Sequence, residues 1–164
     1  MMQNDLYELA EQLGMLLLAR GHKLALAESC TGGWAAQAVT AISGSSAWFD
    51  RGFVTYSNAA KVEMLGVTEQ TLLQYGAVSE QAVREMAQGA LARSRANIAA
   101  AISGIAGPDG GTPEKPVGTV CIAADVDGIV QSFRAILIGD RHEVRQRSAQ
   151  SALSLVRRML LGTA

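Results

Sequence analysis

Histidine, cysteine and proline are scarce in this sequence, and each scarcity narrows what the protein can be. Its 164 residues include two histidines, two cysteines and three prolines. No CxxC or HExxH pattern occurs, and neither His22 nor His142 has metal-ligand spacing around it, so we expect no metal site and no cofactor. Two distant cysteines, Cys30 and Cys121, predict reduced thiols in a cytoplasmic protein rather than a disulfide framework.

The sequence also lacks an excess of one charge and lacks long apolar runs. Fourteen basic and 15 acidic residues leave a net charge of −1, and we therefore expect no nucleic-acid partner. The apolar runs are well short of the ~20 residues that span a bilayer, so no membrane partner is expected either. With 49% hydrophobic residues, the chain can bury a full core without disulfides.

Hydrophobic periodicity and capping signals predict alternating helices and strands. Helices are expected at 5–20, 34–42, around 58–66, from 79 and from 140, and strands at 24–27, 48–56, 97–104, 117–124 and 129–138. Asn58 is expected to cap the third helix, Asp140 and Glu143 form a capping-box pair, and "DVDG" marks a hairpin. This order predicts an α/β fold, a three-layer α/β/α sandwich with a mixed sheet, in a single domain over residues 1–164.

The segment "AESCTGG" (27–33) places a hydroxyl between a buried strand and the start of a helix. Free N–H groups at a helix start stabilise an oxyanion formed nearby, which makes Ser29 a candidate nucleophile. Two alternatives stay open from the residues alone. Ser29 or Thr31 could be an ordinary N-cap, with the glycines making the turn. Cys30 could be the nucleophile, or simply a small core residue.

A serine nucleophile needs a base, and Lys61 is better placed than either histidine. A free lysine has a pKa near 10.4, so burial or a positive neighbour must lower that pKa before the amine can accept a proton at neutral pH. In the first turn of the predicted helix, the helix dipole also disfavours an ammonium group. Tyr56 could carry a proton between Lys61 and a hydroxyl. The alternative is that Lys61 is an exposed lysine.

A glycine-rich loop, "SGIAGPDGGTPEKPVG" (103–118), follows the predicted strand at 97–104. Loops at such strand ends often bind ligands in α/β sheets. The loop has neither the GK[ST] of a phosphate loop nor the GxGxxG of a dinucleotide site. The basic residues Lys115, Arg141 and Arg145 are candidate partners for a phosphate or carboxylate, although each could be an ordinary surface charge.

Several long motifs together resemble one known family. "AESCTGG", "SGSSAWFDRGFVTYSN", "YGAVSE", "SGIAGPDGGTPEKPVGTV" and "GDR" followed by "VR" are similar to the C-terminal domain of the CinA family, over about residues 6 to 160. The resemblance implies an amidohydrolase that converts nicotinamide mononucleotide to nicotinate mononucleotide and ammonia, as part of NAD recycling.

The resemblance also implies roles for individual residues. It assigns Ser29 as the nucleophile, with Tyr56 and Lys61 activating it. It also implies pocket elements at Gly44, Ser46, Ser103 and Gly104. Further candidates for binding the substrate, from their places in the turn, the loop and the last helix, are Thr31, Gly32, Gly107 and Arg145. The partner is expected to be a small-molecule substrate, a pyridine mononucleotide, and the chain is expected to form a homo-oligomer. A regulatory paralogue that binds the nucleotide without catalysis remains the alternative.

Overall fold

The computed structural model describes residues 2–163, with side chains from residue 5 onward, and its centre is a mixed five-stranded sheet. The strands lie in the order β2-β1-β3-β4-β5. Strand β1 is parallel to both β2 and β3, whereas β4 and β5 are antiparallel additions. The strands are β1 (Leu24–Glu28), β2 (Phe49–Val54), β3 (Ile98–Gly104), β4 (Thr119–Val126) and β5 (Ile129–Ile136).

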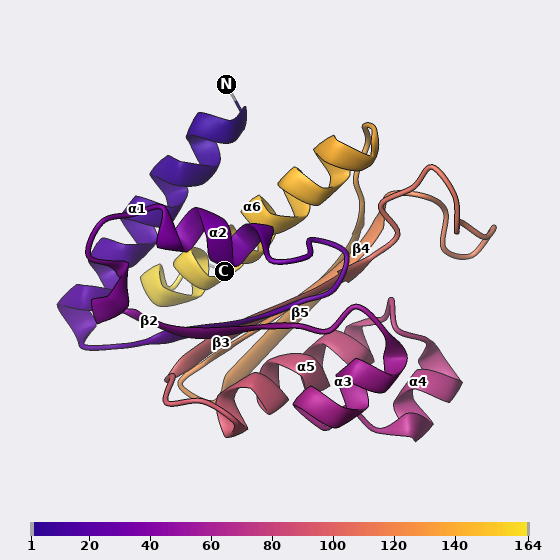
Figure 1. Cartoon of the computed structure of the whole chain (residues 1–164), viewed down its shortest axis with the longest axis horizontal. Coiled ribbons are helices and arrows are strands. Elements are labelled where there is room, and N and C mark those ends of the chain that lie inside the picture. Colours follow the sequence, from indigo (N-terminus) through magenta and orange to yellow (C-terminus); the bar gives the residue numbers. More distant parts are fainter. Residues whose placement is uncertain (1, 164) are drawn as a thin grey trace.

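Helices cover both faces of the sheet, which confirms the predicted three-layer α/β/α fold (Figure 1). On one face lie α1 (Met2–Arg20), α2 (Trp34–Thr40) and α6 (Arg141–Leu161). On the other face α5 (Glu80–Ala92) packs on the strands, with α3 (Asn58–Leu65) and α4 (Glu69–Tyr75) beside it. A short 3₁₀ helix, Ser45–Ala47, precedes β2. Two buried clusters of aliphatic side chains, one on each side of the sheet, form the core.

Local sequence signals explain several element boundaries. The tight turn between β4 and β5 holds Asp127 and Gly128 at φ values of 52° and 88°, which Asp-Gly turns favour. Asp140 and Glu143 make both hydrogen bonds of a capping box at the start of α6. The prediction for α3 was wrong by one residue. Its N-cap is Ser57, whose hydroxyl accepts the N–H of Ala60, and Asn58 is the first helical residue.

A close helix contact fixes α3 against α5. Gly89 of α5 lies against the backbone of Leu65, the last residue of α3, and a Cβ at position 89 would overlap the Leu65 carbonyl oxygen. Only glycine therefore allows the two helices to approach this closely. The contact matters for the site because α3 also carries Lys61.

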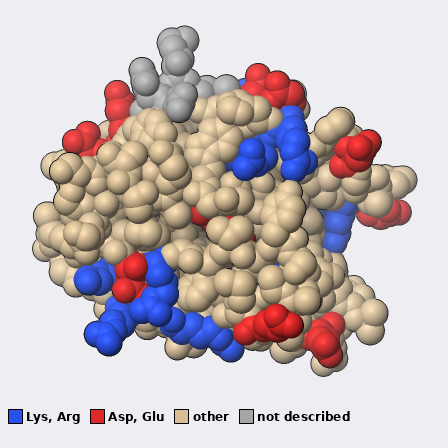
Figure 2. Space-filling view, in the orientation of Figure 1, with Lys and Arg blue, Asp and Glu red and all other residues tan. Residues whose placement is uncertain are grey.

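Charged side chains are divided between separate areas of the surface. Figure 2 shows one group of basic side chains over the start of α6 and another over the end of α5 and the nearby strand ends. Acidic side chains lie near both groups, so this face has no continuous area of one sign. Among residues 2–163, no helix combines the length and apolar character needed to cross a membrane.

Candidate functional site

Ser29 begins the turn that follows the central parallel strand, β1. Its backbone N–H donates to the carbonyl oxygen of Ile102 at 3.0 Å, which continues the β1–β3 pairing by one residue. Because side chains alternate along a strand, Ser29 shares a face with Ala25 and Ala27, the face covered by α3 and α5. The nucleophile candidate is thus rigidly based, with its hydroxyl on the same side of the sheet as Lys61.

Lys61 is a buried lysine whose amine reaches Ser29. Its Nζ lies 3.0 Å from Ser29 Oγ and 2.9 Å from the carbonyl oxygen of Thr55. Only 2% of the residue is exposed, and no acidic group pairs with it among the described residues. Burial lowers the pKa of Lys61 below its usual value because an ammonium loses hydration there. The alternative of an exposed lysine is therefore wrong.

Glu28, the residue before Ser29, fixes the turn from the other face of the sheet. Its buried carboxylate accepts the backbone N–H groups of Ala35 and Ala36 at 2.9 and 3.0 Å, at the start of α2. The N-cap position itself is Gly33, which has no side-chain cap. Neither Ser29 nor Thr31 caps α2, so the reading of these hydroxyls as ordinary N-caps is wrong. The Glu28 carboxylate instead accepts the free N–H groups at the start of α2, where the helix dipole favours a negative charge.

Cys30 lies beside Ser29 but its thiol is not activated. Burial raises the pKa of Cys30 to about 11. The thiolate, which is the reactive form, is therefore rare at neutral pH. A Cβ on Gly104 would approach Cys30 Sγ to 3.2 Å and Val120 to 2.8 Å, so the thiol occupies a tightly packed place. Packing favours the reading of Cys30 as a small core residue.

The Arg145 side chain of α6 holds the turn after Ser29 through hydrogen bonds to the backbone of that turn. Its Nε donates to the carbonyl oxygen of Cys30 at 3.0 Å, and its Nη2 donates to that of Thr31 at 3.1 Å. The guanidinium carbon lies 5.4 Å from the ring centre of Trp34, and the His142 ring packs on the same tryptophan at 4.8 Å. Arg145 thus orients the turn whether or not it also touches a ligand.

A hollow of about 420 Å³ opens beside this turn, and Thr31, Gly32 and Arg145 line it together with neighbouring residues of α1 and α2. The structure therefore brings together three of the candidate substrate-binding residues. Thr31 Oγ1 is buried here and has no hydrogen-bond partner among the described residues. Burying a hydroxyl without a hydrogen-bond partner lowers the stability of the folded protein, so the unpartnered Thr31 Oγ1 is an unusual feature of this hollow.

Other implied residues lie around Ser29 at the same edge of the sheet. The β1–β3 register pairs Glu28 with Ile102, so Ser103 is the next residue across from Ser29 and shares its face. Gly104 ends β3, and Gly107 follows it in the glycine-rich loop. The Gly107 carbonyl oxygen accepts a hydrogen bond from Arg141 at 2.8 Å.

Tyr56 follows β2 on the other side of Ser29 but makes no hydrogen bond to Ser29 or Lys61. It is 62% exposed, and its hydroxyl accepts a hydrogen bond from Arg141 Nη2 at 3.0 Å. The Lys61 amine reaches Ser29 directly, so the geometry does not require Tyr56 to relay the proton. Its predicted role as an activating group stays a prediction.

Gly44 and Ser46 lie at the opposite edge of the sheet. They belong to the 3₁₀ turn that precedes β2, next to Trp48, whose carbonyl oxygen accepts the N–H of Leu24 at the start of β1. Ser29 follows the other end of the same strand. Within one chain, Ser46 therefore lies away from Ser29, and its implied part in binding the substrate stays a prediction. A motif resemblance identifies the segment but does not give its position in space.

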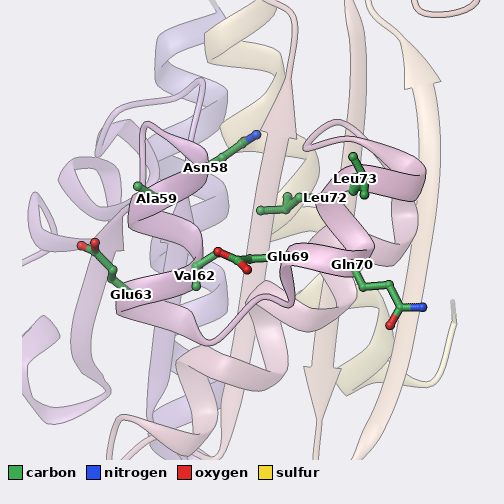
Figure 3. A pocket seen from close by; sticks show the side chains of 8 residues that line it. All are labelled: Asn58, Ala59, Val62, Glu63, Glu69, Gln70, Leu72 and Leu73. Carbon is green, nitrogen blue, oxygen red and sulfur yellow. The ribbon is translucent and has the colours of Figure 1, made fainter.

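A larger hollow, about 710 Å³, lies between α3 and α4 and contains neither Ser29 nor Lys61. Side chains of both α3 and α4 line it, from Asn58 to Glu63 on one helix and from Glu69 to Leu73 on the other (Figure 3). Among the described residues, no group of three or more His, Cys, Asp or Glu side chains is arranged to hold a metal ion.

The fold and the buried pair define a class: a three-layer α/β protein with a serine–lysine site at the carboxyl ends of its parallel strands. Residues 6–160 match the family model described as the CinA C-terminal domain, and the chain belongs to that family.

Relatives and solved structures agree with this assignment. The chain is 56% identical to a protein of Shigella flexneri named nicotinamide-nucleotide amidohydrolase PncC, over 93% of each chain. It is 52% identical to a longer putative competence-damage inducible protein of Symbiobacterium thermophilum, of which it covers 39%. The crystal structure of a competence/damage inducible protein, CihA, from Agrobacterium tumefaciens has a TM-score of 0.92 at 47% identity, covering 96% of both chains.

Reasoning from the sequence missed two groups that the structure places at the site. Glu28 was not singled out, although a carboxylate ending an apolar strand just before a glycine turn is a usable signal. The backbone carbonyl of Thr55, which accepts from Lys61 at 2.9 Å, has no signal in the sequence. Only the folded chain shows that contact.

Proposed function

We propose that this protein is an amidohydrolase that deamidates nicotinamide mononucleotide, releasing nicotinate mononucleotide and ammonia. The observation that carries the proposal is the 3.0 Å contact between Lys61 Nζ and Ser29 Oγ, with the lysine buried. Similarity to proteins named nicotinamide-nucleotide amidohydrolase supports the choice of substrate.

The reaction begins with proton transfer within the buried pair. Neutral Lys61 takes the proton of the Ser29 hydroxyl, and Oγ attacks the carboxamide carbon of the substrate. The tetrahedral intermediate collapses when the protonated lysine gives its proton to the amide nitrogen, which leaves as ammonia. The acyl group stays on Oγ as an ester. Water then attacks that ester, Lys61 accepts the water's proton, and returning it to Oγ releases the acid.

We propose that the oxyanion of each tetrahedral intermediate is held by backbone N–H groups of residues 30–33. Arg145 supports this assignment because it holds the carbonyl oxygens of Cys30 and Thr31 and so orients the peptide groups of the turn. Donors fixed before the reaction need no reorganisation as charge develops, which is why they lower the barrier.

The decisive experiment uses Ser29→Ala with nicotinamide mononucleotide as substrate. We expect turnover to fall by at least about 10³-fold, because the nucleophile is lost, whereas substrate binding stays within a fewfold of the parent. Ammonia release measures the first effect and isothermal titration calorimetry the second. Cys30→Ala is the matched control, and it should retain full activity. Near-normal turnover by Ser29→Ala would refute the proposed nucleophile.

The same assay separates catalysis from mere binding. A regulatory paralogue would bind the mononucleotide and release no ammonia, whereas an amidohydrolase releases stoichiometric ammonia. The unpaired, buried lysine favours the enzyme because a module that only binds ligand gains nothing from a buried amine beside a serine.

A further inference from the structure

Arg141 forms hydrogen bonds to Tyr56 and to Gly107, which follow the strands on either side of Ser29. These three residues form a bridge across the site, with Arg141 at its centre. One Arg141 nitrogen, Nη2, donates to the Tyr56 hydroxyl at 3.0 Å, and the other, Nη1, donates to the Gly107 carbonyl oxygen at 2.8 Å. Tyr56 follows β2 and Gly107 follows β3, whereas Ser29 follows β1, which lies between those two strands. Two strand spacings separate β2 from β3, about 10 Å, so the bridge spans the turn that carries the nucleophile.

The charge of Arg141 has no carboxylate partner. Among the described side chains, the ion pairs are His22 with Asp127 and Arg51 with Asp50. The nearby carboxylates of Asp140 and Glu143 accept backbone N–H groups in the capping box of α6. Arg141 itself is exposed and is the first residue of α6. Two of its five N–H donors are used in the bridge, and the others can serve an anion.

Two other basic residues, the remaining candidates for an anion from the sequence, already donate to backbone carbonyl groups. Lys115 donates to the carbonyl oxygen of Tyr75 at 2.6 Å, which ties the glycine-rich loop to the end of α4. Arg145 is half-buried and donates to the carbonyl oxygens of Cys30 and Thr31. Arg141 donates to a phenol and a single carbonyl, contacts that a doubly charged oxyanion readily replaces because charged acceptors bind guanidinium more strongly.

We infer that Arg141 recognises the phosphate of the substrate and so makes the site selective for a mononucleotide over the corresponding nucleoside. This inference rests on the proposed function. The phosphate takes N–H donors of Arg141 at the mouth of the site, while the carboxamide lies below at Ser29. Arg145, the other candidate arginine from the sequence, then acts on the turn rather than on the phosphate.

The test compares ligands that differ only in the phosphate. In a Ser29→Ala background, calorimetry measures binding of nicotinamide mononucleotide and of nicotinamide riboside, with and without Arg141→Gln. We expect Arg141→Gln to weaken mononucleotide binding by about 10- to 100-fold, the usual range for a hydrogen bond to a charged group. Riboside binding should change by less than about twofold, and Arg141→Lys should recover part of the loss.

Arg158→Gln is the matched control, because it removes one positive charge from the exposed far end of α6. It should change neither affinity by more than about twofold. Equal loss of both ligands in Arg141→Gln would overturn the inference, as would unchanged binding of both. Inhibition of the active enzyme by inorganic phosphate gives a second measure, and it should weaken in Arg141→Gln. If the parent protein releases no ammonia but binds the mononucleotide more tightly than the riboside through Arg141, catalysis is refuted, whereas recognition of the phosphate by Arg141 is retained.

Discussion

The carbonyl oxygen of Thr55 accepts a hydrogen bond from Lys61 Nζ at 2.9 Å, and this contact sets the direction in which the amine can act as a base. A neutral amine has two N–H groups and one lone pair. With one N–H directed at Thr55, the amine can turn its lone pair toward Ser29 Oγ, 3.0 Å away. A backbone carbonyl that follows β2 thus orients the Lys61 amine to deprotonate the Ser29 hydroxyl, which follows β1.

The pH dependence of turnover should report on Lys61. The amine acts only when neutral, so kcat/KM should rise with pH and level off above a pKa that lies below the usual 10.5 of lysine. Lys61→Arg should lower kcat by at least about 10³-fold at all pH values, because a guanidinium does not deprotonate. Ammonia-release kinetics from pH 5 to 10 measure both effects. A pH-independent parent rate would contradict the assignment of Lys61 as the base.

The same lysine should make stability depend on pH. Its folded-state pKa is lowered by burial, so between that pKa and 10.5 the unfolded chain binds a proton that the folded chain does not. Stability should therefore rise with pH through this window, and the cost of burying the charge should remain at lower pH. Urea titrations at several pH values, compared with Lys61→Met, measure the difference. If the unfolding free energies of the two proteins changed with pH in parallel, the pKa of Lys61 would not be lowered in the folded state.

Thr31 offers a test of whether an unpartnered hydroxyl serves the ligand. Thr31→Val has nearly the same shape and removes a buried oxygen that has no partner among the described residues. We expect the free protein to be equally stable or more stable by about 1 kcal/mol. If the hydroxyl binds substrate, KM should rise by about fivefold or more while kcat changes less. An unchanged KM would remove Thr31 from the binding residues.

Gly89 links the packing of α3 to the site. Gly89→Ala places a methyl group against the Leu65 carbonyl oxygen, and we expect it to destabilise the protein by about 2–4 kcal/mol. Gly52→Ala is the matched control, because its new Cβ meets neighbours at ordinary distances of 3.5 Å or more. Thermal unfolding should shift little in the control. A similar shift in both variants would mean that the close approach of α3 and α5 is not what Gly89 protects.

The sequence predicted those parts of the fold that local chemistry determines. The Asp127–Gly128 hairpin and the α6 capping box are confirmed because their signals lie within a few residues of one another. Helix α4 was missed because none of its residues is buried, so it carries no apolar stripe to detect. The order of the strands has no local signal at all, since it depends on contacts between distant segments.

The same division applies to the site. Lys61 was a candidate base because its helix position disfavours an ammonium, with an exposed lysine as the open alternative, and the structure places its amine in contact with Ser29. The helix dipole was also expected to lower the pKa of Lys61, whereas in the structure burial is the main cause of the lowering. Gly44 and Ser46 were grouped with the site by motif, although they lie at the opposite edge of the sheet. Sequence proximity to β2 does not say which end of that strand a segment occupies.

Trp34 gives the molecule a built-in optical probe. Its indole ring contacts both the Arg145 guanidinium and the His142 ring, and it lines the hollow beside the nucleophile turn. The second tryptophan, Trp48, is 3% exposed and lies in the core near Gly14. Fluorescence of a Trp48→Phe variant would therefore follow one indole alone, and its emission would register ligand entry into the hollow without any attached dye.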